Sequence, residues 1–179
     1  MHILDIVENA ISAGADLITI DMSVDEAGDQ LAISVGDNGR GMSKEMLERV
    51  RSPFTTSRTT RDVGLGIPLF AASCEKADGH LRITSKKDVG TQVTAKYRYS
   101  HIDRPPLGDI AETLYTLTLL NPNIDFALSA SKSGERFVYD TREIKATLDG
   151  LPITHPDVLS FIKGFLKEGA MQIFGGYET

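Results

Sequence analysis

Two hydrophobic periods follow each other within the first 35 residues, and this switch is what most constrains the fold. Apolar residues recur every three to four positions from residue 3 to residue 11 and stop at Gly14, which predicts a helix ended by glycine. Residues 17–22 and 31–35 then alternate between apolar and polar side chains, which predicts two paired strands. This order favours helices layered on one face of a mostly antiparallel sheet.

The same periods continue to about residue 99. Ser43 is placed to cap a helix, whereas residues 52–63 are hydroxyl-rich and basic without aliphatic periodicity, which predicts a mobile loop. The further elements expected in this region are a helix at 44–51, a helix from Ile67 to a stop at Gly79, and paired strands at 81–85 and 92–99.

A second region is expected after Arg104-Pro105-Pro106, which breaks both periods. We predict domains at 1–102 and 107–179, the second a small α+β appendage. The overall class is α+β, a two-layer α/β sandwich with a mixed, mostly antiparallel sheet. The appendage is expected to contain a helix ending at Asn121-Pro122, strands near 124–130 and 136–139, and helices near 142–148 and 156–167, with Phe161, Phe165 and Phe174 in its core.

Charge and hydropathy exclude several classes of partner. A net charge of −6 and a pI near 5.2 argue against nonspecific binding to nucleic acid or anionic membranes. No apolar run approaches the roughly 18 residues that a membrane span needs, and no leader precedes the first helix. The single cysteine, Cys74, has apolar helical neighbours and is expected to be a packed thiol. We therefore expect a soluble, cytoplasmic protein.

The stretch Asp37-Asn38-Gly39-Arg40-Gly41-Met42 follows a predicted strand and precedes a helix. A carboxylate at a strand end can accept the exocyclic amine of adenine, and Gly39 and Gly41 let the backbone turn closely under a base. The alternative is an ordinary tight turn, for which Asp-Asn-Gly is equally suitable.

Polar residues of the first helix form a second candidate group. Asp5 and Asn9 lie one turn apart and so share a helix face. The Asn9 amide oxygen can bind Mg²⁺, and Asp5 can orient a water as a general base. Glu8 lies about 100° away around the helix, so we favour Asp5. Alternatively, all three are solvated residues of an amphipathic helix.

Two glycine-containing turns complete the set. Gly64-Leu65-Gly66 opens a helix, so its amides and the helix dipole can receive phosphate oxygens. Gly90-Thr91 begins a strand, where the Thr91 hydroxyl can bond the edge of a base directly or through water. The alternative for Gly64-Leu65-Gly66 is a simple helix start, and the alternative for Gly90-Thr91 is a hairpin turn.

In their order along the chain, with the first-helix group before Asp37–Met42, the four groups resemble the boxes of the Bergerat-fold ATPases, the superfamily of DNA gyrase, heat-shock chaperones, sensor histidine kinases and MutL. The resemblance covers about residues 1–99. It implies that Asn9 holds Mg²⁺, that Asp37 reads adenine, and that Thr91 completes the adenine contact. It also makes residues 52–66 an ATP lid. The implied nucleotide contacts are Asn9, Asp37, Gly39, Gly41, Met42, Thr56, Arg58, Gly64, Leu65, Gly66 and Thr91.

The pattern mixes two branches of the superfamily. Residues 7–15 and Thr56-Ser57-Arg58 look like MutL, with Arg58 in the place of its lid lysine, whereas Pro53-Phe54-Thr55-Thr56 looks like sensor kinases. Arg58 is alternatively an exposed loop cation. In hydrolysing members the residue at position 5 is glutamate, and the shorter Asp5 is expected to slow water activation.

Three functions remain open at this stage. The favoured one is a slow regulatory or conformational ATPase using ATP and Mg²⁺. The others are a kinase acting in trans on a Ser or His of a partner, as anti-sigma kinases do, and an ATP sensor without turnover. The segment 110–139 resembles the start of the MutL transducer domain, and the C-terminal region is a candidate for docking a protein partner. A homodimer is a further alternative.

Overall fold

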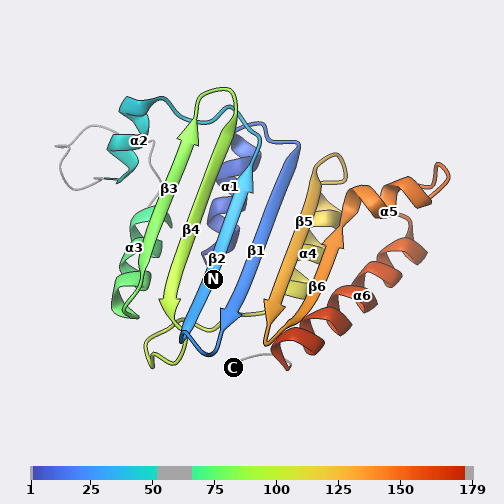
Figure 1. The fold of residues 1–179 in the computed structure, drawn as a ribbon. Coiled ribbons are helices and arrows are strands. Elements are labelled where there is room, and N and C mark those ends of the chain that lie inside the picture. Colours follow the sequence, from blue (N-terminus) through green and yellow to red (C-terminus); the bar gives the residue numbers. More distant parts are fainter. Residues whose placement is uncertain (1, 52–65, 176–179) are drawn as a thin grey trace.

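The computed structural model describes residues 2–51 and 66–175, which form one six-stranded sheet in the order β3-β4-β2-β1-β5-β6 with helices against it (Figure 1). This arrangement confirms the predicted α+β class. The helices are α1 (Ile3–Ser12), α2 (Lys44–Arg51), α3 (Gly66–Lys76), α4 (Ile110–Leu120), α5 (Thr141–Thr147) and α6 (Pro156–Phe174). The strands are β1 (Leu17–Asp25), β2 (Gln30–Asp37), β3 (His80–Lys86), β4 (Gly90–Arg98), β5 (Asp125–Lys132) and β6 (Glu135–Asp140).

The sheet is mixed and mostly antiparallel. β1 pairs antiparallel with β2 and parallel with β5, while β2–β4, β3–β4 and β5–β6 are antiparallel. Among the described strands, the one parallel pair is the junction between the two regions of the chain, because α4 carries the chain back across the sheet to lay β5 beside β1.

One face of the sheet carries the core and the other is polar. In β1, Ile18, Ile20 and Met22 are at most 2% exposed, whereas the alternating Asp21 and Ser23 are exposed. The other strands repeat this alternation in register, and α1 and α4 lie behind the sheet in the view of Figure 1. The helices therefore cover one face, as predicted for a two-layer sandwich.

The sheet runs continuously across the predicted boundary near residue 104. Backbone pairing joins Leu17–Val24 of β1 to Asp125–Lys132 of β5, and the buried apolar side chains from both regions form a single cluster. The division into 1–102 and 107–179 stays a prediction about domain organisation. The later region adds two strands and three helices to the existing layers.

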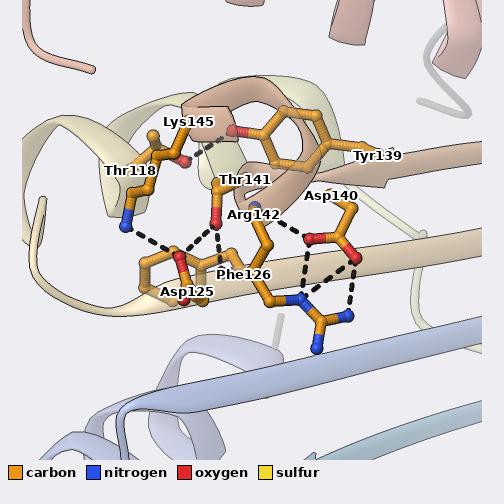
Figure 2. A network of polar contacts seen from close by, with 8 residues as sticks. All are labelled: Thr118, Asp125, Phe126, Tyr139, Asp140, Thr141, Arg142 and Lys145. Atoms are coloured by element: carbon orange, nitrogen blue, oxygen red, sulfur yellow. Dashed lines mark hydrogen bonds and ion pairs between the residues drawn. The ribbon is translucent and has the colours of Figure 1, made fainter. Parts of the chain in front are cut away.

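A network of buried hydroxyls holds the later region together (Figure 2). Thr141 is fully buried; its Oγ1 accepts the Phe126 amide hydrogen bond at 2.9 Å and donates to the Asp125 carboxylate at 3.0 Å. The hydroxyls of Thr118 on α4 and Tyr139 on β6 lie 2.8 Å apart. Burial raises the pKa of Tyr139 to about 12, so this hydroxyl stays neutral and bonded.

Two predictions about single side chains have different outcomes. Cys74 is fully buried, and burial raises the pKa of its thiol, as expected for a packed cysteine. The prediction that Phe161 lies in the core is wrong: its side chain is 61% exposed, and Phe165 is 37% exposed. The buried stripe of α6 consists of Val158, Ile162, Leu166, Gly169 and Ile173. No helix among the described residues is long and apolar enough to cross a bilayer.

Candidate functional site

The first side of the candidate site is the end of β2, where Asp37 lies opposite Thr91 of β4. In each strand, the residue next to Asp37 or Thr91 faces the polar side of the sheet, so the Asp37 and Thr91 side chains are on the helix-covered face. The Asp37 Oδ1 atom accepts a hydrogen bond from the Gly39 amide at 2.8 Å. This bond folds the chain tightly after the strand and fixes the carboxylate at its end.

Two glycines allow backbones to approach closely at this end of the sheet. Gly90 has a φ of +134°, and a Cβ atom there would lie 1.9 Å from the Asp37 carbonyl oxygen. Gly41 has a φ of +59°, and a Cβ there would lie 2.1 Å from the Lys86 carbonyl oxygen. Both positions therefore require glycine, and they lock the Asp37–Met42 turn onto the β3–β4 turn.

Ser85 is a residue that the sequence reading missed. Its hydroxyl accepts the Met42 amide hydrogen bond at 2.8 Å and lies 2.9 Å from the Thr91 hydroxyl. It thus joins two of the predicted boxes. The sequence placed Ser85 at a strand end, but only the β3–β4 register, which sets it opposite Thr91, reveals this contact.

The first helix is joined to the same turn at its C-terminal end. The Ala13 carbonyl accepts a hydrogen bond from the Arg40 amide at 3.0 Å, and Gly39 packs against Ala13. The Asn38 side chain accepts hydrogen bonds from the Asp16 and Leu17 amides, both at 3.0 Å. These contacts join the C-terminal end of α1 to the Asp37–Met42 turn, and Asn9 lies one helical turn before Ala13.

Asp5 lies on α1, one turn before Asn9, and is close to Gly66, the first residue of α3. A Cβ atom on Gly66 would lie 3.0 Å from Asp5 Cβ and 3.2 Å from its Oδ2 atom, so a larger residue would crowd the carboxylate. His2 Nδ1 is 3.7 Å from the same oxygen, and the His2 ring stacks on Phe70 of α3. The structure thus brings the first and third predicted boxes together.

The residues up to 101 match a family model described as histidine kinase-, DNA gyrase B-, and HSP90-like ATPase, over residues 2–101. The chain belongs to this family. Domains of the histidine kinase-like ATPase family bind ATP with Mg²⁺, which confirms the predicted cofactors. The four boxes occupy the matched region, and strands β5 and β6 lie outside it.

Individual relatives come from two branches of the family. The chain is 30% identical to the DNA mismatch repair protein MutL of Neorickettsia sennetsu, over 76% of this chain and 26% of that protein. It is 30% identical to sporulation kinase C of Bacillus subtilis, over 49% of this chain and 20% of that protein. The chain therefore spans about a quarter or less of the length of these relatives.

A solved structure supports the fold over a similar extent. The N-terminal domain of a DNA repair protein superimposes with a TM-score of 0.50 and 16% identity, covering 76% of this chain and 50% of that one. The covered share exceeds the family match and shows that the similarity of fold extends beyond the matched residues.

The donor atoms of the site suit magnesium held mainly by a nucleotide. No group of three or more His, Cys, Asp or Glu residues is placed to hold a metal anywhere in the ranges 2–51 and 66–175. Asn9 instead offers one exposed amide oxygen as a donor on α1. Magnesium commonly binds through one or two protein oxygens together with substrate phosphates, and this donor set fits that habit.

Four predicted contacts fall outside the described residues: Thr56, Arg58, Gly64 and Leu65. Gly66, the last residue of the predicted lid, begins α3. A shallow hollow of about 500 Å³ lies at the same sheet end but on the polar face, where Thr19, Gly36 and Gln92 line it. Asp37 and Thr91 line this hollow as well.

Proposed function

We propose that this chain binds ATP with Mg²⁺ at the β2–β4 end of the sheet and acts as a slow regulatory or conformational ATPase in the cytoplasm. Family membership supports nucleotide binding. Asp37 would read adenine, with Gly39, Gly41 and Met42 beneath the base and Thr91 beside it. Asn9 would hold Mg²⁺, and Asp5 would act on the attacking water.

One observation carries the adenine assignment. Asp37 uses its Oδ1 atom to bind the Gly39 amide, and within the described residues no hydrogen bond engages its Oδ2 atom. A carboxylate with one oxygen fixed and one free is a rigid acceptor for an exocyclic amine. The Thr91 hydroxyl, held by Ser85, stands opposite it in the strand register and supplies a second polar contact.

The phosphate side of the proposal depends on Asp5 and Asn9. Mg²⁺ bound with ATP would neutralise phosphate charge and favour attack on the γ-phosphate. Asp5 Oδ2 lies close to His2 and to the start of α3, where the helix dipole favours negative charge. An aspartate at this position reaches one methylene less far than a glutamate, which supports slow turnover.

The extent of similarity favours a conformational ATPase over a kinase. The match to MutL covers 76% of the chain and so extends past the family region to β5, whereas the match to sporulation kinase C covers 49%. A kinase acting in trans on a Ser or His of a partner is the second candidate, since the kinase relatives share the nucleotide region. An ATP sensor without turnover is the third.

Calorimetric titration with ATP and Mg²⁺ tests the binding site. We expect Asp37→Asn to weaken ATP binding by at least about tenfold, because an amide nitrogen would face the adenine amine. Asp21→Asn is the matched control, since Asp21 is an exposed aspartate on the polar face of β1. Equal affinity of the Asp37→Asn variant and the unchanged protein would refute the adenine assignment.

Turnover assays separate the three functions. Phosphate release that disappears in Asp5→Asn while ATP affinity is retained supports hydrolysis through Asp5. Asp5→Glu is expected to raise the rate, because it restores the longer carboxylate. Unchanged release in Asp5→Asn would exclude Asp5 as the base. Transfer of label from γ-labelled ATP to a co-purified protein would instead establish the kinase.

A further inference from the structure

The outer edge of the sheet at β6 carries features that the nucleotide site does not use. Among the described strands, β6 has only β5 as a neighbour in the sheet. Val138 at its centre is 46% exposed, and Arg136 beside it is also exposed. On the helix face, Phe161 stacks on Phe165 with ring centroids 5.9 Å apart, and Phe165 contacts Phe137 of β6 at 5.0 Å. An unpaired strand edge thus lies next to an exposed aromatic pair.

The backbone direction of β6 follows from two hydrogen bonds of β5. The Asp125 amide donates toward β1, to Asp16, and the Phe126 amide donates toward β6, to Thr141. Successive residues alternate, so Leu128 and Ala130 also face β6 and bond Tyr139 and Phe137, their partners in the register. Arg136 and Val138 therefore direct their amide and carbonyl groups outward, as Asp140 does its amide, while the Asp140 carbonyl opens α5 as its N-cap.

These outward residues complement themselves in one antiparallel register. With a two-fold axis at Val138, each Arg136 lies opposite the Asp140 of a second copy, and Val138 faces Val138. A centre at Arg136 or Asp140 would instead oppose two like charges. A centre at Phe137 would set Arg136 opposite Val138, so neither Arg136 nor Asp140 would face an opposite charge in its cross-strand pair. Asp140 keeps its ion pair with Arg142 at 2.6 Å, so the second arginine would add to an existing pair (Figure 2).

We propose that two copies of this chain associate by antiparallel pairing of their β6 strands about Val138, which joins the two sheets into one. A two-fold axis perpendicular to the sheet puts both helix layers on the same side. The aromatic pairs Phe161–Phe165 of the two α6 helices then pack against each other and lose their exposure. Backbone bonds fix the register, the Arg136–Asp140 pairs select it, and the aromatic contact adds apolar burial.

Sedimentation of the chain over a range of concentrations, without nucleotide, tests the association. We expect a monomer–dimer equilibrium that Arg136→Glu weakens at least tenfold, since glutamate would oppose Asp140. Arg82→Glu is the matched control, because Arg82 is exposed on β3, the opposite edge strand. A chain that stays monomeric up to about 1 mM, or a dimer equally sensitive to both variants, would overturn the proposal. Circular dichroism melts show that each variant is folded.

Cysteine cross-linking tests the register independently. Residues opposite each other in a hydrogen-bonded antiparallel pair have Cα atoms about 5.5 Å apart, within the range of a disulfide. Val138→Cys is expected to form a covalent dimer with a mild oxidant such as diamide, and Arg136→Cys is expected not to, because it faces Asp140. The native Cys74 is buried and does not compete. Cross-linking of Arg136→Cys, or none at Val138→Cys, would overturn this register.

Discussion

Two regions of the sheet, the β2–β4 end and the β5–β6 end, are stabilised by different kinds of contact. At the β2–β4 end, Gly41 and Gly90 adopt positive φ angles and let backbone carbonyls approach where any side chain would collide. At the β5–β6 end, the buried hydroxyls of Thr118, Tyr139 and Thr141 bridge strands and helices. The first region is therefore stabilised by close backbone packing at glycines, and the second by hydrogen bonds of buried side chains.

This difference separates ligand binding from structure. Close backbone packing around the glycines fixes the β2–β4 turns, while Asp5 and Asn9 are exposed and one oxygen of Asp37 has no hydrogen bond to the described residues. In the later region the polar atoms bind one another. Across the described residues, no buried side-chain nitrogen or oxygen is without a hydrogen-bond partner. We therefore expect changes at the first end to affect both ATP binding and stability, and changes at the second to affect stability alone.

The largest effect is expected at Gly90. Gly90→Ala would place a Cβ atom 1.9 Å from the Asp37 carbonyl oxygen, and the φ of +134° is unfavourable for alanine. Because the obstacle is backbone, β4 must move away from Asp37. We expect a loss of about 3 kcal/mol or more in the free energy of unfolding, together with the loss of ATP binding. Chemical denaturation and calorimetry measure the two effects.

Gly134→Ala is the control at the other end of the sheet. Gly134 has a φ of +85°, but nothing lies within 4 Å of an added Cβ, so only backbone strain remains. We expect a loss of about 1–2 kcal/mol and unchanged ATP affinity. If Gly134→Ala destabilised as strongly as Gly90→Ala, the close approach at Gly90 would not be the cause of its effect.

The second effect is expected at Thr141. Thr141→Val keeps the shape of the side chain but removes the hydroxyl that accepts from the Phe126 amide and donates to Asp125. A buried amide without a partner costs about 1–3 kcal/mol, so we expect that loss of unfolding free energy with unchanged ATP affinity. Chemical denaturation measures the first quantity and titration the second.

Thr147→Val provides a matched control for Thr141. Its hydroxyl bonds the Ile144 carbonyl at 2.8 Å on an exposed turn of α5, where water can replace the bond. We expect a change within about 0.5 kcal/mol. Reduced ATP affinity in Thr141→Val, with Thr147→Val unaffected, would show that the later region is coupled to the nucleotide end.

Local patterns predicted the elements well because they depend on neighbouring residues. Alternation identified β1 and β2, and Ser43 marked α2, whose bounds match the prediction. β1 runs three residues past the predicted Met22, since Ser23, Val24 and Asp25 continue to alternate while pairing with β2. Gly41 and Gly90, in the second and fourth boxes, were recognised from the sequence pattern, and the close backbone contacts at both positions explain why glycine is required there.

Contacts between distant segments could not be predicted from the same patterns. The alternation at 124–130 indicated a strand, but nothing in it specified parallel pairing with β1. The contact of Ser85 with Thr91 likewise depends on strand register. Phe161 and Phe165 fit the helical period as well as their neighbours do, and only packing against α4 and β6 decides that Ile162 and Leu166 are buried instead.

The smallest effect is expected at Asp140, where the later region depends on a charge rather than a hydroxyl. The Arg142 guanidinium and the Arg142 amide bond the carboxylate and hold the pKa of Asp140 below its ordinary value. A lowered folded pKa means that this stabilisation is present above the unfolded pKa and is lost as pH falls through the folded one. Asp140→Asn keeps the helix cap but removes the charge, so we expect it to cost less than about 1 kcal/mol at pH 7, because Arg142 is half exposed. The difference in melting temperature from the unchanged chain should shrink below about pH 4. Asp109→Asn, at the cap of α4, is the control; a difference at Asp140 that stays constant with pH would show that its charge contributes nothing to stability.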